Sequence, residues 1–357
     1  MAKYRFGDVV KEVKINVNRD NNPYEFYVAG DHLDSEDLII RRKGRFSTDD
    51  VGPAFTRIFH PGQVLYGSRR TYLKKVAIAD FDGICANTTF VLETKDNNIF
   101  TQELLPFIML SDRFTEWSVS HSKGSTNPYV LFSDLADFEI ELPDINSQRS
   151  LAKKLASAHN VKESYKTLLK CTDELVKSQF IEMFKDAPIV KLGEHIDTQS
   201  GGTPNTKKTE YYEGGDIPWL SSGEVNQGYI NGTEKYITKA GLDNSSAKWS
   251  PEHSIVIAMY GATAGKVGYL NIPVTTNQAV CTLLPSSSFV PKFLYYAVSN
   301  KSSWMVSQCQ GAAQPNISQG IIRKMEIPMP EKSLQREFVL IVEQADKSKQ
   351  IAFSRAS

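Results

Sequence analysis

The sequence lacks any long apolar run. No stretch approaches the roughly 20 consecutive apolar residues that a membrane-spanning helix needs, and residues 1–10 contain no secretory apolar core. Cysteine is scarce as well: Cys85, Cys171, Cys281 and Cys309 form no CxxC pair and have no cluster of histidines beside them. These absences argue against a membrane protein, a zinc site and a disulfide framework, and we expect a cytoplasmic protein.

Complete motifs for cofactor binding or catalysis are missing too. Residues 261–267 (GATAGKV) resemble a phosphate-binding loop, but only three residues separate the two glycines and no Ser or Thr follows Lys266. Two Asn-Pro-Tyr triplets, at 22–24 and 127–129, resemble part of the tetrapeptide with which amino-methyltransferases hold a target adenine, but no glycine-rich cofactor fingerprint accompanies them. The sequence therefore favours a binding protein over an enzyme.

The chain carries no net charge, since 41 Lys and Arg residues balance 41 Asp and Glu residues. The distribution is uneven, however: between positions 41 and 75 there are nine basic residues and only two acidic ones, Asp49 and Asp50. This local excess of seven positive charges predicts either a solvated basic surface or one that faces phosphate groups. The charge distribution alone does not decide between these two kinds of surface.

The most informative feature present is an internal repeat. Residues 124–149 (GSTNPYVLFSDLADFEIELPDINSQR) align without a gap with residues 311–336 (GAAQPNISQGIIRKMEIPMPEKSLQR), 187 positions later. Seven positions are identical, where background usage would give roughly one or two. Weaker matches pair residues 64–67 with 258–261 and residues 86–88 with 276–278. A period this long predicts two tandem domains and not a solenoid.

After each copy of the repeat the apolar spacing becomes helical. Between 148 and 184 the apolar residues step by three and four, which predicts a coiled-coil seam formed by Leu151, Leu155, Ala158, Val161, Tyr165, Leu168 and Leu175. Such a helix would reach roughly 55 Å, too long for one small domain, so we expect a spacer. A second helix should begin at Gln335 and run for about 23 residues. We expect the two helices to pair antiparallel; the alternative is that each packs on its own domain.

Each half before its helix combines strand and helix patterns, so the predicted fold class is α/β (α+β). The expected strands are residues 38–41, 64–66, 76–79, 89–92, 254–259, 267–270 and 279–284, and the expected helices are residues 101–111 and 291–299. The predicted division is a first domain, a central helix, a second domain and a shorter C-terminal helix, at 1–147, 148–187, 188–333 and 334–357.

Several ordered segments resemble the DNA specificity subunit of type I restriction-modification systems. They are residues 201–225 (GGTPNTKKTEYYEGGDIPWLSSGEV), 260–280 (YGATAGKVGYLNIPVTTNQAV), 311–330 and 334–338 (LQREF). The resemblance spans the whole chain and is stronger in the second half. It implies a non-catalytic subunit with a pseudo-two-fold repeat, in which two target recognition domains each read half of a bipartite DNA sequence and an antiparallel coiled coil sets the gap.

The resemblance also implies partners. Two modification (methyltransferase) subunits would carry S-adenosylmethionine and methylate adenine, and restriction subunits would cleave with ATP and Mg²⁺, while this subunit would bind double-stranded DNA and hold no cofactor or metal. The chain departs from the family in two ways: the last helix is shorter than the first, and the first domain lacks the SGGTP loop of residues 200–204. The short helix makes the coil asymmetric or marks a truncation.

We expect loops to bring basic residues to guanine, amides to adenine, and hydroxyls and basic residues to phosphates. In the first domain the predicted DNA contacts are Arg41, Arg42, Lys43, Ser68, Arg69, Arg70 and Lys74. In the second they are Thr203, Ser221, Ser222, Tyr260, Lys266, Gln310 and Gln314. Two other functions remain open: a stand-alone DNA methyltransferase or nuclease with embedded recognition domains, and a coiled-coil scaffold that does not touch DNA.

Overall fold

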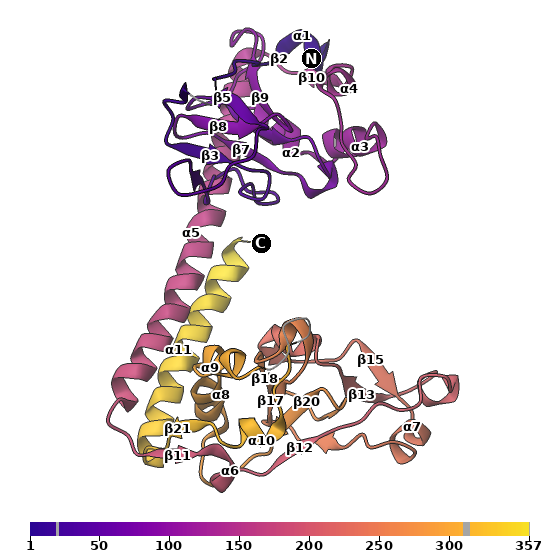
Figure 1. Cartoon of the computed structure of the whole chain (residues 1–357), viewed down its shortest axis with the longest axis vertical. Coiled ribbons are helices and arrows are strands. Elements are labelled where there is room, and N and C mark those ends of the chain that lie inside the picture. Colours follow the sequence, from indigo (N-terminus) through magenta and orange to yellow (C-terminus); the bar gives the residue numbers. More distant parts are fainter. Residues whose placement is uncertain (19–20, 310–314, 357) are drawn as a thin grey trace. The chain divides into compact units, whose positions relative to one another are not determined.

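The computed structural model describes residues 1–18, 21–309 and 315–356, and it divides the chain into two units, Met1–Glu163 and Ser164–Ser357 (Figure 1). Each unit combines short strands with helices, which confirms the predicted mixed fold class. Within the described residues, no helix is both long enough and apolar enough to cross a membrane.

The first unit contains two four-stranded sheets and a two-stranded one. The first sheet has the order β2 (Val10–Glu12), β9 (Thr89–Thr94), β6 (Val64–Gly67), β7 (Val76–Ile78), and the second has the order β4 (Gly44–Arg45), β3 (Phe26–Val28), β8 (Gly83–Ala86), β5 (Phe55–Phe59). Strand β1 (Ala2–Arg5) pairs with β10 (Glu139–Leu142). The helical segments are α1 (Phe6–Val9), η2 (Thr71–Leu73), α2 (Leu105–Leu110), α3 (Asp112–Ser120) and α4 (Phe132–Ala136).

The second unit repeats this plan. One sheet has the order β12 (Thr198–Ser200), β20 (Val280–Leu283), β17 (Ile255–Ala258), β18 (Val267–Leu270), β14 (Tyr229–Ile230), and the other has the order β15 (Lys235–Ile237), β13 (Ile217–Leu220), β19 (Val274–Thr276), β16 (Trp249–Ser250). Strand β11 (Ile189–Lys191) pairs with β21 (Glu326–Pro328). The helical segments are α6 (Leu192–His195), η3 (Thr209–Tyr211), η4 (Glu224–Gln227), α7 (Lys239–Asp243), η5 (Gly261–Thr263), α8 (Pro291–Ser299), α9 (Ser302–Ser307) and α10 (Gln319–Ile322).

All but one of the expected strands are present. Residues 38–41 are not a strand, because only Ile39 forms an isolated bridge, to Ile78. The cause is local: the Asp37 carboxylate accepts hydrogen bonds from the backbone N–H of Ile39 at 3.0 Å and from Nε of Arg41 at 2.8 Å. A side chain that bonds its own backbone two residues later competes with a sheet ladder.

The backbone hydrogen bonds between strands also correct one of the weaker matches of the sequence repeat, that of residues 64–67. The backbone N–H of Ser68 donates to the Thr88 carbonyl at 3.0 Å, and the N–H of Met259 donates in the same way to Ala279 at 2.8 Å. Residues 64–67 therefore correspond to 255–258, and the alignment with 258–261 was wrong by three positions. Backbone pairing sets the register, and the shared Tyr-Gly pair that suggested the other alignment is coincidental.

Two buried glutamines, Gln148 and Gln335, make the same three hydrogen bonds at the starts of the two long helices. The Oε1 atom of Gln148 accepts from the backbone N–H of Thr101, and its Nε2 donates to the carbonyls of Ile99 and Pro143. Gln335 bonds in the same way to Val290, Ser288 and Pro330, at distances of 2.8, 3.3 and 2.8 Å. Each amide thus joins a long helix to the segment before α2 or α8. Because Thr101 and Val290 make the same hydrogen bond, they are equivalent positions, and α2 corresponds to α8.

The long helices are α5 (Ile145–Phe184) and α11 (Lys332–Ala356), which lie side by side in Figure 1. Helix α5 begins at Ile145, three residues before the predicted start at residue 148. Asp144 caps it, because its carboxylate accepts hydrogen bonds from the backbone N–H groups of Asn146 and Ser147, both at 3.1 Å. Phe184 packs on Phe338, while Asp173 pairs with Lys349. The contact partner in α11 moves to a higher residue number as the residue in α5 moves to a lower one. This order confirms that the two helices pair antiparallel.

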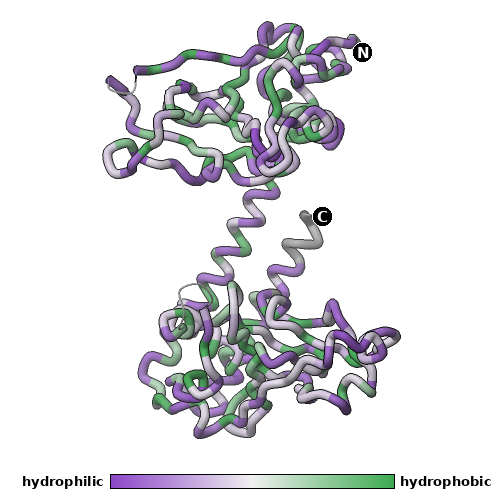
Figure 2. The backbone as a smooth tube through the Cα atoms, turned by 45° about the vertical axis from the view of Figure 1, so that its right-hand side comes forward, coloured by the Kyte–Doolittle hydropathy of each residue, from purple (hydrophilic) through white to green (hydrophobic). Residues whose placement is uncertain are grey.

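The predicted seam is wrong by one residue in the second unit. Leu168 and Leu175 are 50% and 61% exposed, whereas Val176, Phe180 and Phe184 are almost fully buried. Figure 2 shows hydrophobic and hydrophilic residues interspersed along the helix, and the adjacent apolar pair Leu175 and Val176 gives α5 two candidate apolar faces here. The phenylalanines decide which face is buried, because their rings pack against Phe293 of α8 and Phe338 of α11, mostly edge to face.

Two neighbouring substitutions test which face of α5 is buried in the second unit. Val176→Asp buries a carboxylate in the core, so we expect the free energy of unfolding of the second unit to fall by about 3 kcal/mol or more. Leu175→Asp should change it by less than ~0.5 kcal/mol, because the side chain is exposed. Urea denaturation followed by tryptophan fluorescence reports mainly on this unit, since Trp219, Trp249 and Trp304 lie in it. Equal effects would contradict the register.

Replacing Gln335 by Leu tests the anchor at the start of α11. The substitution keeps the side-chain volume but leaves one backbone N–H and two carbonyls without their partner, so we expect a loss of about 3 kcal/mol of stability in the second unit. Arg336→Leu is the matched control, because Arg336 is exposed and adjacent. Hydrogen exchange near Val290 should accelerate in the glutamine variant alone; unchanged exchange there would rule out the anchoring role.

Candidate functional site

One loop in each unit follows the same course and carries residues predicted to bind DNA. These loops are residues 68–75, between β6 and β7, and residues 259–266, between β17 and β18. Arg69 forms an isolated bridge with Tyr129, and Tyr260 forms one with Asn316. The N–H of the next residue donates to a proline carbonyl in each unit: Arg70 to Pro128 at 2.7 Å, and Gly261 to Pro315 at 3.0 Å. Arg69 therefore corresponds to Tyr260, and Arg70 to Gly261.

The loop of the first unit holds two residues in strained backbone. Arg70 and Lys74 have φ values of 51° and 48°, in the left-handed region. The second unit places Gly261 and Gly265 at these positions, with φ values of 77° and 81°. The left-handed conformation costs a non-glycine residue about 1–2 kcal/mol, and such strain often accompanies a functional side chain. Arg70 is the clearest case, because its side chain is exposed and the turn could have used glycine.

Most of the basic residues between 41 and 75 are neutralised by carboxylates from elsewhere in the first unit. The ion pairs are Arg41 with Asp37 and Glu163, Arg42 with Asp34, Arg45 with Glu25, Arg57 with Glu12, and Lys74 with Glu36 and Asp112. Lys43 lies over the rings of Phe26 and Phe81, and Lys75 donates to the Gly30 carbonyl.

The exposed charge that remains is concentrated in the loop of residues 68–75. Within the described part of the chain, neither Arg69 nor Arg70 has a carboxylate partner, and Arg69 lies 6.0 Å from the centre of the Tyr129 ring. The Ser68 hydroxyl is buried and donates to the Thr88 carbonyl at 2.6 Å, so it holds the loop in place. The structure thus brings Ser68, Arg69, Arg70 and Lys74 together in one loop and directs two free guanidinium groups to solvent.

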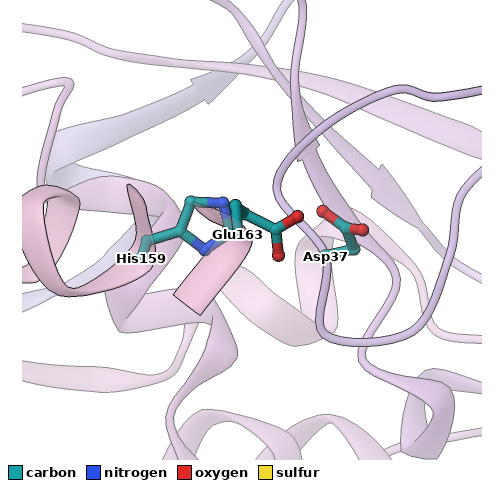
Figure 3. Close-up of side chains that lie close together, drawn as sticks. All are labelled: Asp37, His159 and Glu163. Atoms are coloured by element: carbon teal, nitrogen blue, oxygen red, sulfur yellow. The ribbon is translucent and has the colours of Figure 1, made fainter. Parts of the chain in front are cut away.

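Arg41 belongs to a cluster that the sequence analysis missed. Figure 3 shows His159 and Glu163 of α5 beside Asp37, and one ligand atom from each lies within 4.8 Å of the others. Such a group could hold a metal ion, and the Nε2 atom of His159 is buried with no hydrogen-bond partner among the described residues. However, Arg41 already binds both carboxylates, and its hydrogen bond to Asp37 raises the pKa of the guanidinium.

A metal ion at this cluster would have to displace the Arg41 guanidinium, so we assign the group a structural role. It ties the turn at Asp37 to helix α5. No local sequence pattern indicates this cluster, because Asp37 and Glu163 lie more than a hundred residues apart. Arg41 as a DNA contact stays a prediction.

In the second unit the candidate residues gather where β13 and β19 end. The two strands run parallel, with Leu220 beside Thr276, so Ser221 and Ser222 lie next to Asn277. The Thr203 hydroxyl donates to Oε1 of Gln278 at 2.6 Å. The Ser221 hydroxyl donates to Glu224 at 2.9 Å, whereas the Ser222 side chain has no hydrogen bond among the described residues. Tyr260 and Lys266 lie at the two ends of the neighbouring loop and are exposed.

Two further residues of this group were not among the predicted contacts. Asn277 and Gln278 follow the buried strand β19 directly, and amides at a strand end were a signal that the sequence contained. The Asn277 side chain accepts the N–H of Ala279 at 3.1 Å, which shapes the turn. The predicted contacts Gln310 and Gln314 lie outside the described residues.

Packing accounts for the two glycines that precede Thr203. A Cβ atom on Gly201 would lie 1.8 Å from the Thr276 carbonyl oxygen, and one on Gly202 would lie 2.7 Å from Ser246. The N–H of Gly202 donates to that same Thr276 carbonyl at 2.9 Å. These glycines hold the loop of Thr203 against β19, so their role lies inside the unit.

Comparison with known families identifies what this arrangement resembles. The family model for the type I restriction modification DNA specificity domain matches residues 3–170 and again residues 185–354. The specificity subunit of the Escherichia coli type I restriction enzyme EcoR124I/EcoR124II is 28% identical over 160 residues, which cover 43% of this chain and 40% of the relative. The chain thus matches less than half the length of that relative.

Other relatives match over nearly the whole chain. The specificity subunit of the Haemophilus influenzae type I enzyme HindI is 19% identical over an alignment of 418 residues, covering 93% of this chain and 90% of the relative. The crystal structure of a type I restriction-modification S subunit from M. genitalium covers 99% of this chain and 91% of its own, with a TM-score of 0.60 and 16% identity. A chain from a study of type I complex assembly gives a TM-score of 0.56 at 20% identity. These structures support the fold.

Replacing Arg70 by Gly tests the strain in the loop. Glycine tolerates φ 51°, so we expect the first unit to gain about 0.5–1 kcal/mol after the entropy cost of an added glycine is subtracted. Arg70→Ala keeps the strain and should leave stability within ~0.5 kcal/mol. Urea denaturation monitored by hydrogen exchange of β6 and β7 amides separates the two variants. A loss of stability in Arg70→Gly would show that the arginine side chain supports the fold.

Proposed function

The chain belongs to the type I restriction-modification DNA specificity family, and on this basis we propose that it is the sequence-specific DNA-recognition subunit of such a complex. Each unit reads one half of a bipartite target, and the paired helices α5 and α11 set the gap between the halves. The observation that carries the proposal is the pair of corresponding loops, residues 68–75 and 259–266, because two like modules with like loops suit two half-sites.

The two loops differ in chemistry, so the two half-sites should differ in sequence. Arg69 and Arg70 are exposed guanidinium groups without carboxylate partners among the described residues, which suits bidentate contact with guanine or with phosphate. The second loop presents Tyr260 and Lys266, and the amides of Asn277 and Gln278 lie in the turn that follows β19. Amide side chains pair with the N6 and N7 positions of adenine. We therefore propose a guanine-containing first half-site and an adenine-containing second one.

In this role the chain performs no catalysis. Two modification subunits with bound S-adenosylmethionine would methylate adenine, and restriction subunits would use ATP and Mg²⁺ for cleavage, while this subunit holds none of these cofactors. We place the complex in the cytoplasm, where the host DNA is. A stand-alone methyltransferase or nuclease, the alternative left open by the sequence, predicts methyl transfer or metal-dependent cleavage by the isolated chain.

Co-expression with the modification subunit of the same genome in an unmethylated host tests the proposal directly. Long-read sequencing should find N6-methyladenine in one split motif with a fixed gap. Exchanging residues 1–147 for those of another specificity subunit should change one half of the motif and preserve the other. The isolated chain should transfer no methyl group. A soluble, assembled complex that leaves DNA unmethylated, or methylation at an unsplit site, would refute the proposal.

Arg70 provides a test at the level of one side chain. Arg70→Ala and Arg70→Gly should both weaken binding of the assembled complex to its target at least about fivefold, because each removes the guanidinium. If Arg70 contacts phosphate, the slope of log affinity against log salt should fall by about one. Arg113→Ala is the matched control, since that side chain packs over Phe138. Wild-type affinity and slope in both Arg70 variants would remove this residue from the interface.

A further inference from the structure

The first unit contains a cavity of about 460 Å³ between the β6–β7 edge of its sheet, helix α2 and helix α5. Its walls are mainly apolar, and carboxylates lie among the lining side chains. The residues that matter here are Ile39, Val64, Ile78 and Phe107 on the apolar side and Asp80 and Glu103 on the polar side. A space of this size and character is within the range that holds small ligands.

The internal repeat shows which residues occupy this space in the second unit. Ile39 bridges Ile78 in parallel, just as Tyr229 of β14 pairs in parallel with Tyr269 of β18. The N–H of Gly62 donates to Ala79 at 2.8 Å, as that of His253 does to Leu270, and both residues have positive φ. Tyr229, Tyr269 and His253 are therefore the counterparts of Ile39, Ile78 and Gly62.

In the second unit these counterparts fill the space with rings. The Tyr229 ring lies 5.7 Å from Tyr269 and 5.6 Å from Tyr295, measured between centroids. The Tyr269 hydroxyl is 2.9 Å from Nδ1 of His253. Through the α2–α8 correspondence, the counterpart of Tyr295 is Pro106. Where the second unit has three tyrosines and a histidine, the first unit thus has two isoleucines, a proline and a glycine, and the space that the rings fill in the second unit is open in the first.

The charged side chains at the wall of the cavity also differ between the two units. In the second unit Lys292 of α8 pairs with Glu343 of α11 at 3.1 Å. The counterparts in the first unit are Glu103, which lies just before α2, and Ala156 on α5. The charge at the first position is therefore reversed in sign, and the second position carries no charge. Within the described residues, neither Glu103 nor Asp80 forms an ion pair. The cavity therefore has an apolar interior and a negatively charged side.

We propose that this cavity binds a small aromatic cation. One or two rings enter the apolar part, where the second unit holds its own tyrosine rings, and an amine lies toward Asp80 and Glu103. Burial of the rings contributes most of the affinity, and the carboxylates select the charge, because an anionic ligand would meet two like charges. Well-formed apolar cavities in proteins do take up ring compounds of matching size.

Three compounds with the same ring and different charge test the proposal on the full-length chain: tyramine, p-cresol and 4-hydroxyphenylacetate. Isoleucine methyl NMR reports the site, because Ile39, Ile40 and Ile78 line it, and calorimetry gives the affinities. Tyramine should shift these methyl signals and bind about fivefold more tightly than p-cresol, with 4-hydroxyphenylacetate weakest. The assay needs neither DNA nor partner subunits, so its outcome is independent of the proposed function.

Two kinds of variant complete the test. Ile78→Tyr and Ile39→Tyr each restore a ring found in the second unit and should reduce tyramine binding at least about tenfold; Ile39 is 38% exposed, so its variant should fold normally. Glu103→Gln keeps the cavity and should bring tyramine and p-cresol to similar affinities. Absence of methyl shifts with all three compounds, or unchanged binding in both tyrosine variants, would overturn the site. Equal affinity for the three compounds in the unsubstituted chain would overturn its charge selectivity.

Discussion

The structure depends on a buried side-chain amide at the start of each long helix. Gln148 and Gln335 are 1% and 0% exposed, and each satisfies one backbone N–H and two carbonyls that would otherwise be buried without partners. A buried amide is stable only when its hydrogen-bonding groups are paired, so the geometry is strict. This strict geometry explains why both units share one local arrangement. It comprises the start of the long helix, the proline before it and the segment before α2 or α8.

Around this buried amide the two units differ in their loop residues and in how the space between sheet and helix is filled. The second unit uses glycines where its loop needs left-handed backbone, fills the space between sheet and helix with tyrosines, and buries phenylalanines of α5 against α8 and α11. The first unit holds Arg70 and Lys74 in the strained positions and leaves the corresponding space as a cavity. One backbone plan thus carries two different surfaces, as the proposed recognition of two different half-sites requires.

The electrostatics of the candidate interface are a property of the folded unit. Counting charges along residues 41–75 indicated a basic surface, but carboxylates from Glu12 to Glu163 pair with five of those nine side chains. Ion pairs between residues far apart in the chain are invisible to a window of sequence. Of the exposed basic residues in this window, those without a carboxylate partner among the described residues are Lys43, which lies over two phenylalanine rings, and Arg69 and Arg70, which share one loop. The position of that loop therefore matters more than the total charge.

The sequence by itself determined the duplication, the mixed fold class, most strands and the two antiparallel helices, because each rests on local spacing or on direct repetition of residues. Only the tertiary structure decided which face of α5 is buried, since Leu168 and Leu169, or Leu175 and Val176, are adjacent apolar residues that a heptad pattern cannot rank. It also decided the register of residues 64–67, the ion-pair cluster at Asp37, and the gathering of Asn277 and Gln278 with Thr203. Each of these depends on contacts between distant segments, where ladder hydrogen bonds, ring packing and paired charges choose among arrangements that the local pattern leaves equal.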